Sequence, residues 1–220
     1  MGERWATFDC YGTLVDWNGG IGAELARLFG AEHRERLLAR YHELEPLIEA
    51  EQPGSRYRDV LALALERLAG EEGVELAPGE RDALARSLPG WAVFPEVSAA
   101  LEEARGHGFR LCILSNSDPE LIQASMEPIG TPFDDAITAS EIGSYKPALG
   151  HWRSFAERRG RLPDVHVAAS LYHDVAPANE LEIPSVWVNR LAEKTGDYRP
   201  TREIPDLAPL PRVLDELVVS

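Results

Sequence analysis

The sequence is poor in cysteine and has no long apolar run. Its 220 residues include two cysteines, Cys10 and Cys112, and both lie in apolar, strand-like segments. Two such cysteines exclude a disulfide framework and are typical of a reducing compartment, so we expect a cytoplasmic protein. A nucleophilic thiol at Cys10, beside Asp9, is the poorer alternative because no base lies near it in the sequence.

Basic residues are also scarce, and this excludes two classes of partner. The chain has 22 Lys and Arg against 37 Asp and Glu, a net charge of −15. An acidic surface repels nucleic acid and anionic lipid. No apolar run reaches the ~18 residues of a membrane span, and residues 1–8 have no signal-peptide core. We therefore expect neither nucleic acid nor a membrane as a partner.

Short apolar runs typical of buried strands alternate with stretches of helical periodicity. The expected strands are Trp5–Phe8, Arg110–Leu114, Ala136–Thr138, Val165–Ala168 and Ser185–Val188. The expected helices are Glu96–Arg105, Pro119–Ile129, Leu149–Arg159, Val175–Leu181 and, at the end of the chain, Arg212–Leu217, which follows a loop or edge segment, Asp197–Pro211. This alternation predicts an α/β fold, a Rossmann-like parallel sheet covered on both faces.

Residues 19–90 show helical periodicity without a convincing strand. The expected helices there are Glu24–Phe29, Glu32–Glu51, Arg56–Ala69 and Glu80–Leu88. A helical cap inserted after the first strand would close a site at the strand ends and exclude water. The sequence therefore predicts a catalytic core of residues 1–18 and 91–220 and a helical cap domain of residues 19–90.

Polar residues directly follow three of the expected strands. Asp9 follows the first strand, Ser115 and Asn116 end the second, and the segment Ser170–Asp174 comes after a later one. In parallel sheets of this kind, ligands bind at the carboxyl ends of the strands. These side chains are therefore the candidates for a functional site.

Four segments occur in an order that resembles the haloacid dehalogenase superfamily. They are FDCYGT at 8–13, LSNSD at 114–118, SYKP at 144–147 and SLYHDVAPANELEIPSVWVNR at 170–190. Any one of them alone would be weak, but four in order, each in the expected place, are specific. Within the superfamily the chain looks most like the type II 2-haloacid dehalogenases. The resemblance implies the core-and-cap architecture of that family over nearly the whole chain.

The resemblance implies four catalytic residues. Asp9 would attack the substrate carbon and form an ester, which splits one difficult step into two. The Thr13 hydroxyl would hold the Asp9 carboxylate, and Lys146 would keep it ionised. Asp174 would activate the water that hydrolyses the ester.

The resemblance also implies substrate contacts. Ser115 and Asn116 would bind the substrate carboxylate or an oxyanion through the hydroxyl and backbone N–H groups. Arg40 lies 31 residues after Asp9, the spacing at which type II dehalogenases place an arginine that contacts the halide. Arg34 and Arg36 on the same helical stretch are the alternatives to it.

Three aromatic residues complete the expected substrate contacts. Tyr11 and Trp152 would wall the pocket, and His173 would donate a hydrogen bond to a small halide, although packing is the alternative for each of them.

Two positions depart from the superfamily members that act on phosphate. Those members carry a second aspartate where this chain has Tyr11, and an acid in their fourth motif, which corresponds to residues 168–174 here, where this chain has Ala169. Mg²⁺ prefers several oxygen ligands in octahedral geometry, which Asp9 and Asp174 alone supply poorly. We therefore expect no metal ion and no cofactor, and attack at carbon rather than at phosphorus.

The expected function is hydrolysis of short 2-haloacids, fluoroacetate among the candidates, to 2-hydroxy acids. Three alternatives stay open: a hydrolase of another small carboxylate such as azetidine-2-carboxylate, a Mg²⁺-dependent phosphatase with a rebuilt site, and a catalytically silent protein of the same fold. The expected partner is a small haloacid, and a homodimer is expected because relatives are often dimers. The fourth motif departs from well-known type II enzymes at Ala169 and Leu171, which replace a serine and an asparagine.

Overall fold

In the computed structural model, which describes residues 2–218, a six-stranded parallel sheet forms the centre of the larger lobe. Its strand order is β3-β2-β1-β4-β5-β6, and each neighbouring pair is parallel. The strands are β1 (Arg4–Phe8), β2 (Phe109–Ser115), β3 (Asp135–Thr138), β4 (Val165–Ala168), β5 (Ser185–Val188) and β6 (Arg202–Ile204). The five predicted strands are confirmed, and β6 forms the sheet edge within the segment expected as a loop or edge.

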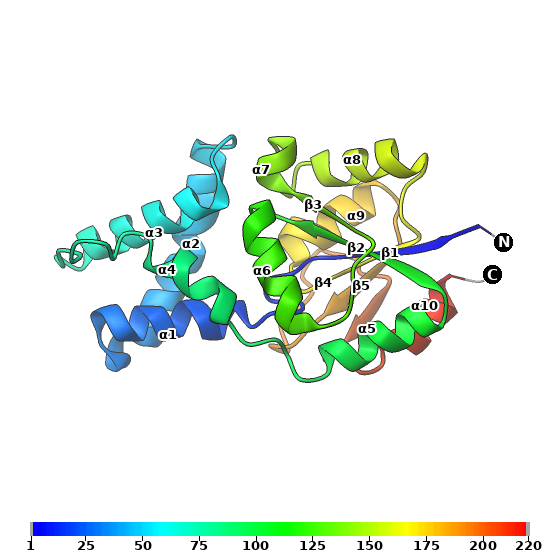
Figure 1. The fold of residues 1–220 in the computed structure, drawn as a ribbon, viewed down its shortest axis with the longest axis horizontal. Coiled ribbons are helices and arrows are strands. Elements are labelled where there is room, and N and C mark those ends of the chain that lie inside the picture. The colour runs from blue at the N-terminus through cyan, green and yellow to red at the C-terminus, as the bar shows by residue number, and fades with distance from the viewer. Residues whose placement is uncertain (1, 219–220) are drawn as a thin grey trace.

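Helices cover both faces of this sheet. In Figure 1, α5 and α10 lie on one side of the strands, and α7 and α8 lie on the other. The helices of this lobe are α5 (Val97–Gly106), α6 (Pro119–Ile129), α7 (Ala139–Ile142), α8 (Gly150–Arg159), the π-helical turn η3 (Leu171–Val175), α9 (Ala176–Glu180) and α10 (Leu210–Leu217). The central strands are buried because they are short apolar runs with a helix on each face.

The strand order reverses at β1, which pairs with β2 on one side and with β4 on the other. Such a reversal opens a crevice at the carboxyl ends of the two strands, where doubly wound sheets bind ligands. The turn that follows β1 contains Gly12, whose φ of 86° is left-handed and favours glycine. Asp9, directly after β1, and Asp174, six residues beyond β4, therefore meet at this crevice.

A second, smaller lobe of helices stands at the carboxyl ends of the strands (Figure 1). It contains α1 (Trp17–Phe29), the 3₁₀ turn η1 (Ala31–His33), α2 (Arg34–Glu51), α3 (Tyr57–Glu71), α4 (Ala83–Ser87) and the 3₁₀ turn η2 (Leu88–Gly90). Apolar side chains of α2 and α3, such as Ile48 and Leu61, are fully buried. The exact division into core and cap domains stays a prediction; α1 begins at Trp17, two residues before the predicted boundary.

Within the described residues, no helix is both long enough and apolar enough to cross a membrane.

Candidate functional site

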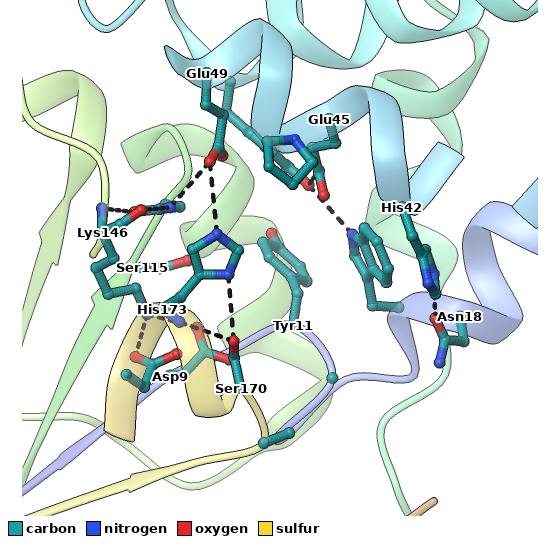
Figure 2. A pocket seen from close by; sticks show the side chains of 17 residues that line it. Asp9, Tyr11, Asn18, His42, Glu45, Glu49, Ser115, Lys146, Ser170 and His173 are labelled. Carbon is teal, nitrogen blue, oxygen red and sulfur yellow. Dashed lines mark hydrogen bonds and ion pairs between the residues drawn. The ribbon is translucent and has the colours of Figure 1, made fainter. Parts of the chain in front are cut away.

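A cavity of about 280 Å³ lies between the two lobes, over the crevice at β1 and β4. The carboxyl-terminal end of the sheet contributes Asp9 after β1, Ser115 at the end of β2 and Asp174 in η3, and the helical lobe contributes Trp17 and Glu45. Figure 2 shows the side chains of both lobes pointing into the same space. The sequence-predicted site residues are therefore best judged by whether they reach this cavity.

Asp9 is held at both carboxylate oxygens. Its Oδ2 accepts a hydrogen bond from the Thr13 hydroxyl at 2.9 Å, and its Oδ1 accepts one from Lys146 Nζ at 2.9 Å. The Thr13 oxygen in turn accepts from the Ala169 backbone N–H at 2.9 Å, which ties the β1 turn to the end of β4. Burial raises the pKa of Asp9, while Lys146 and Thr13 oppose this rise by stabilising the carboxylate. The carboxylate is thus oriented and faces the cavity.

Lys146 lies between two carboxylates. Its ammonium donates to Asp9, to Asp174 Oδ1 at 2.7 Å and to the Leu114 carbonyl at 2.9 Å, so its three N–H bonds are all in use. Burial alone would lower the pKa of Lys146, but Asp174 and Asp9 raise it above its usual value. In Asp174, burial is outweighed by Lys146 and by His166, and the pKa is lowered well below its usual value. Lys146 and Asp174 are therefore charged at neutral pH, and the Lys146 ammonium stabilises the ionised form of Asp9.

His166 supports Asp174 from inside the core. Its Nε2 lies 2.9 Å from Asp174 Oδ1, and its Nδ1 lies 2.9 Å from the Thr7 hydroxyl oxygen. Trp152 packs against the His166 ring, with centroids 5.3 Å apart in an edge-to-face arrangement. The sequence analysis did not select His166, although a histidine inside the apolar run of β4 was a usable signal.

Asn116 anchors the backbone of Lys146. Its Oδ1 accepts from the Lys146 N–H at 2.6 Å, and its Nδ2 donates to the Lys146 carbonyl at 3.0 Å. The Asn116 side chain therefore positions the lysine loop, and Asn116 and the neighbouring Ser115 both line the cavity.

Tyr11 and His173 also reach the cavity, as predicted from the sequence. The Tyr11 hydroxyl lies 3.1 Å from Ser125 Oγ, and its ring stacks on Tyr57 with centroids 6.3 Å apart. His173 Nδ1 lies 3.3 Å from Ser170 Oγ, and burial lowers the pKa of His173. His173 is therefore neutral at neutral pH and can donate a hydrogen bond from one ring nitrogen.

Two predicted site residues lie elsewhere, and for these the structure corrects the sequence analysis. The Arg40 guanidinium is on the outer side of α2, in ion pairs with Glu43 at 2.6 Å and Glu71 at 2.7 Å, and does not line the cavity. Arg34 and Arg36 are likewise absent from the cavity lining. Trp152 is fully buried beneath the site and packs against His166 instead of walling the pocket.

Two buried glutamates of α2 line the cavity opposite Asp9, and the sequence analysis missed both. We call Glu45 and Glu49 the cap wall; they are 9% and 7% exposed. Glu45 Oε1 accepts hydrogen bonds from the hydroxyls of Tyr57 at 2.6 Å and Tyr41 at 3.3 Å. Burial raises the pKa of Glu45 to about 7, although both tyrosines oppose the rise. The pKa of Glu49 is raised to about 9, by burial and then by the charge of Glu45.

A sequence signal for the cap wall did exist. Glu45 and Glu49 are four residues apart, and they share the buried face of α2 with Tyr41 and Ile48. Acids on the apolar face of a helix are uncommon unless they are paired or functional.

The donor set at the carboxyl ends of β1 and β4 does not fit Mg²⁺. The Lys146 ammonium lies between Asp9 and Asp174, where a cation shared by the two carboxylates would sit. Ala169 supplies no side-chain oxygen, and within residues 2–218 no cluster of three or more His, Cys, Asp or Glu side chains is arranged to hold a metal ion.

Comparison with known proteins places the chain among hydrolases. A family model described as haloacid dehalogenase-like hydrolase matches residues 4–168. The chain is 24% identical over 193 residues to (S)-2-haloacid dehalogenase 4A of Burkholderia cepacia, an alignment that covers 85% of this chain and 83% of that protein. It is 31% identical over 191 residues to the phosphoserine phosphatase of Thermus thermophilus, covering 83% of this chain and 74% of that one.

Among solved structures, the fold is similar to that of an L-2-haloacid dehalogenase from Xanthobacter autotrophicus with chloropropionic acid covalently bound. The TM-score is 0.85, the identity is 19%, and the match covers 99% of this chain and 100% of the other. At this identity the likeness shows the fold.

Proposed function

The chain belongs to the haloacid dehalogenase-like hydrolase family, and from this premise we propose that it hydrolyses short 2-haloacids to 2-hydroxy acids through an ester on Asp9, without a metal ion. The observation that carries the proposal is the Lys146 ammonium, 2.9 Å from Asp9 and 2.7 Å from Asp174. An ammonium in this place keeps Asp9 ionised but offers little to a phosphate dianion, since each of its N–H bonds already has an acceptor.

In the first step, a carboxylate oxygen of Asp9 attacks C2 of the haloacid. A bond forms between that oxygen and C2 while the carbon–halogen bond breaks, and the halide leaves with the electron pair. Lys146 and Thr13 hold the carboxylate in one orientation, which lowers the entropic part of the barrier. Ser115 and the backbone of Asn116 are the groups we assign to the substrate carboxylate, and His173 is the donor we assign to the halide.

In the second step, water attacks the carboxyl carbon of the Asp9 ester and releases the 2-hydroxy acid. Both strong contacts of Asp174, from Lys146 and His166, are made to Oδ1, so Oδ2 is the oxygen we assign to the attacking water. Asp174 takes one proton from the water, the bond between the Asp9 carboxyl carbon and the ester oxygen breaks, and Asp174 returns the proton to the leaving oxygen. The second water proton is released to solvent as the Asp9 carboxylate is regenerated. His166 acts here as a positioning residue.

Several relatives support a halide as the leaving group, because their names describe haloacid dehalogenases. The relative named as a phosphoserine phosphatase supports phosphate instead. Phosphoryl transfer needs a cation at the phosphate oxygens, and the donor set at Asp9 and Asp174 does not provide a Mg²⁺ site. Attack at carbon is therefore the function that this site supports best.

The test measures halide release from chloroacetate, fluoroacetate and both enantiomers of 2-chloropropionate in EDTA. Asp9→Asn is the control variant, and phosphate release from phosphoserine with Mg²⁺ is measured alongside. We expect halide release that persists in EDTA and disappears in Asp9→Asn. Phosphate release that requires Mg²⁺, without any halide release, would overturn the proposal.

A further inference from the structure

The proposed function leaves the cap wall, Glu45 and Glu49, without a role. Resting on that function, we propose that the cap wall binds a protonated amino group, so that the preferred substrate carries an ammonium as well as the leaving group. Figure 2 shows both glutamates entering the cavity from α2, with Asp9 on the opposite side and His173 in between.

Glu49 has no strong partner within the described residues. It is 7% exposed, its one hydrogen bond is from Asn116 Nδ2 at 3.4 Å, and His173 Nε2 lies 4.0 Å from it. The Lys146 charge opposes the rise in the pKa of Glu49, but Lys146 does not hydrogen-bond to Glu49, because the three ammonium N–H bonds are used elsewhere. A buried carboxylate without a cation is costly, and a bound ammonium would remove this cost.

Aromatic rings next to the cap wall favour the same ligand independently of the acids. Tyr11, Trp17 and Tyr57 line the cavity. The Trp17 Nε1–H donates to the Tyr57 hydroxyl at 3.2 Å, and Tyr57 stacks on Tyr11, so the rings are held in place. Aromatic faces beside carboxylates attract cations, and ammonium ligands are bound in this way.

We call the part of the cavity formed by Asp9, Asp174 and Lys146 the core end. Its charges also favour a ligand that carries an ammonium group. When Asp9 is ionised, as its attack on carbon requires, two carboxylates, Asp9 and Asp174, and one ammonium, Lys146, leave one net negative charge there. Among residues 2–218, no arginine lines the cavity, and Lys146 is the single lysine that does. A simple haloacid brings a second net negative charge into this space, whereas an amino-substituted haloacid is a zwitterion and brings none.

Binding of an ammonium would also change the protonation of the cap wall. Burial raises the pKa of Glu49 to about 9, so in the empty site it holds a proton at pH 7.5. The titratable groups that face the cap wall are Tyr41 of α2, Tyr57 of α3, Tyr145 and Lys146 of the loop before α8, and His173 of η3. An ammonium close to Glu49 would lower its pKa and release this proton.

A protonated Glu49 could instead donate a hydrogen bond to the substrate carboxylate. The two interpretations differ in the direction of their pH dependence. Ammonium binding strengthens as the pH rises from 6 to 9, because the glutamates ionise. Carboxylate binding by a protonated glutamate weakens over the same interval.

The decisive substrates are 4-amino-2-chlorobutanoate and 2-chloropentanoate, which differ by an ammonium in place of a methyl group. We expect kcat/KM for chloride release to be about tenfold or more higher for the amino compound. Glu45→Gln and Glu49→Gln should each bring this ratio towards one. Glu43→Gln, on the exposed side of the same helix, is the matched control and should leave the ratio unchanged.

Calorimetry with the stable products gives a second measurement that needs no turnover. We expect 4-amino-2-hydroxybutanoate to bind more tightly than 2-hydroxypentanoate, to release a proton at pH 7.5 and to bind still more tightly at pH 9. Equal or weaker binding of the amino compound, or affinity that falls as the pH rises, would overturn the inference. Chloride release from 2-chloropropionate tests the proposed function separately. If no chloride is released, the proposed function fails, and the calorimetric result still decides whether the cap wall binds an ammonium group.

Discussion

Each end of the cavity contains a buried carboxyl group, and its pKa is lowered at one end and raised at the other. At the core end, the Asp174 carboxyl is 1% exposed and contacts Lys146 and His166, and its pKa is lowered. At the cap wall, Glu49 is nearly as buried but has no lysine or arginine partner within the described residues, and its pKa is raised to about 9. The comparison teaches that the partner, and not burial alone, decides the charge of a buried carboxyl group.

This difference assigns a role to each end. At the core end, Lys146 and Asp174 are charged before a substrate arrives, and Lys146 orients the nucleophile Asp9 and stabilises its ionised form. The charge of the cap wall depends on what binds there, which suits recognition. The predictions below test this comparison, beginning with the largest expected effect.

Removing the cation should make the core end unstable. Lys146→Met leaves Asp9 and Asp174 buried without their shared partner, and we expect the free energy of unfolding to fall by about 3–5 kcal/mol. Urea denaturation at pH 7 measures this change. Adding Asp174→Asn to the variant should restore part of the stability, and a double variant less stable than the single one would contradict the pairing.

Weakening the second contact of Asp174 should slow the second chemical step. His166→Phe keeps a ring against Trp152 but removes the hydrogen bond to Asp174. We expect ester hydrolysis to slow by about 10²-fold, so that the ester on Asp9 accumulates. Mass spectrometry of the quenched protein measures the adduct, and a slower enzyme without any adduct would contradict the positioning role.

The cap wall should make the protein less stable as the pH rises. The pKa of Glu49 is about 9 in the folded protein, against an ordinary value of 4.5 in an unfolded chain, so between these two pH values the folded state binds the extra proton. Stability is therefore lost with increasing pH, by up to about 1.4 kcal/mol per pH unit for this group. We expect Glu49→Gln to gain stability relative to wild type between pH 5 and pH 9, as measured by urea denaturation at each pH. Glu43→Gln should show no such gain, and a constant difference for Glu49→Gln would refute the raised pKa.

The smallest effect is expected outside both ends of the cavity. Arg40→Gln removes two exposed ion pairs, with Glu43 and Glu71, which contribute little at a surface. We expect kcat/KM for haloacids to stay within about twofold of wild type. Steady-state chloride release measures it, and a large loss would restore the halide contact that the sequence spacing predicts for Arg40.

The sequence predicted the core of the site well, because its residues follow strand ends directly. Asp9 and Thr13 belong to one tight turn after β1, and the parallel sheet brings Asp174 to the same crevice. The segment SYKP at 144–147 brings Lys146 to Asp9, the contact that the resemblance implies, and the structure adds its contact with Asp174. A residue that directly follows a strand must lie near the end of that strand, because the short connection allows few other positions. The place of such a residue in the site can therefore be predicted from the sequence.

The helical lobe was harder to predict for a physical reason. Each residue turns an α-helix by about 100°, so a count of residues from Asp9 does not determine the face on which a cap residue lies. Arg40 is on the outer face of α2, whereas Glu45 and Glu49 face inward. Trp152 and His166 show a second reason: both are buried in the core, and burial beneath a site is set by tertiary packing.

The most direct test of the account follows oxygen atoms in a single turnover. The enzyme, in excess over 2-chloropropionate, reacts in water enriched in ¹⁸O, and both the product and the peptide that contains Asp9 are analysed by mass spectrometry. The account predicts that the new hydroxyl of the 2-hydroxy acid carries ¹⁶O from Asp9 and that ¹⁸O enters the Asp9 carboxylate. A product labelled with ¹⁸O in the first turnover, with no label in Asp9, would contradict attack by Asp9 and indicate direct attack by water.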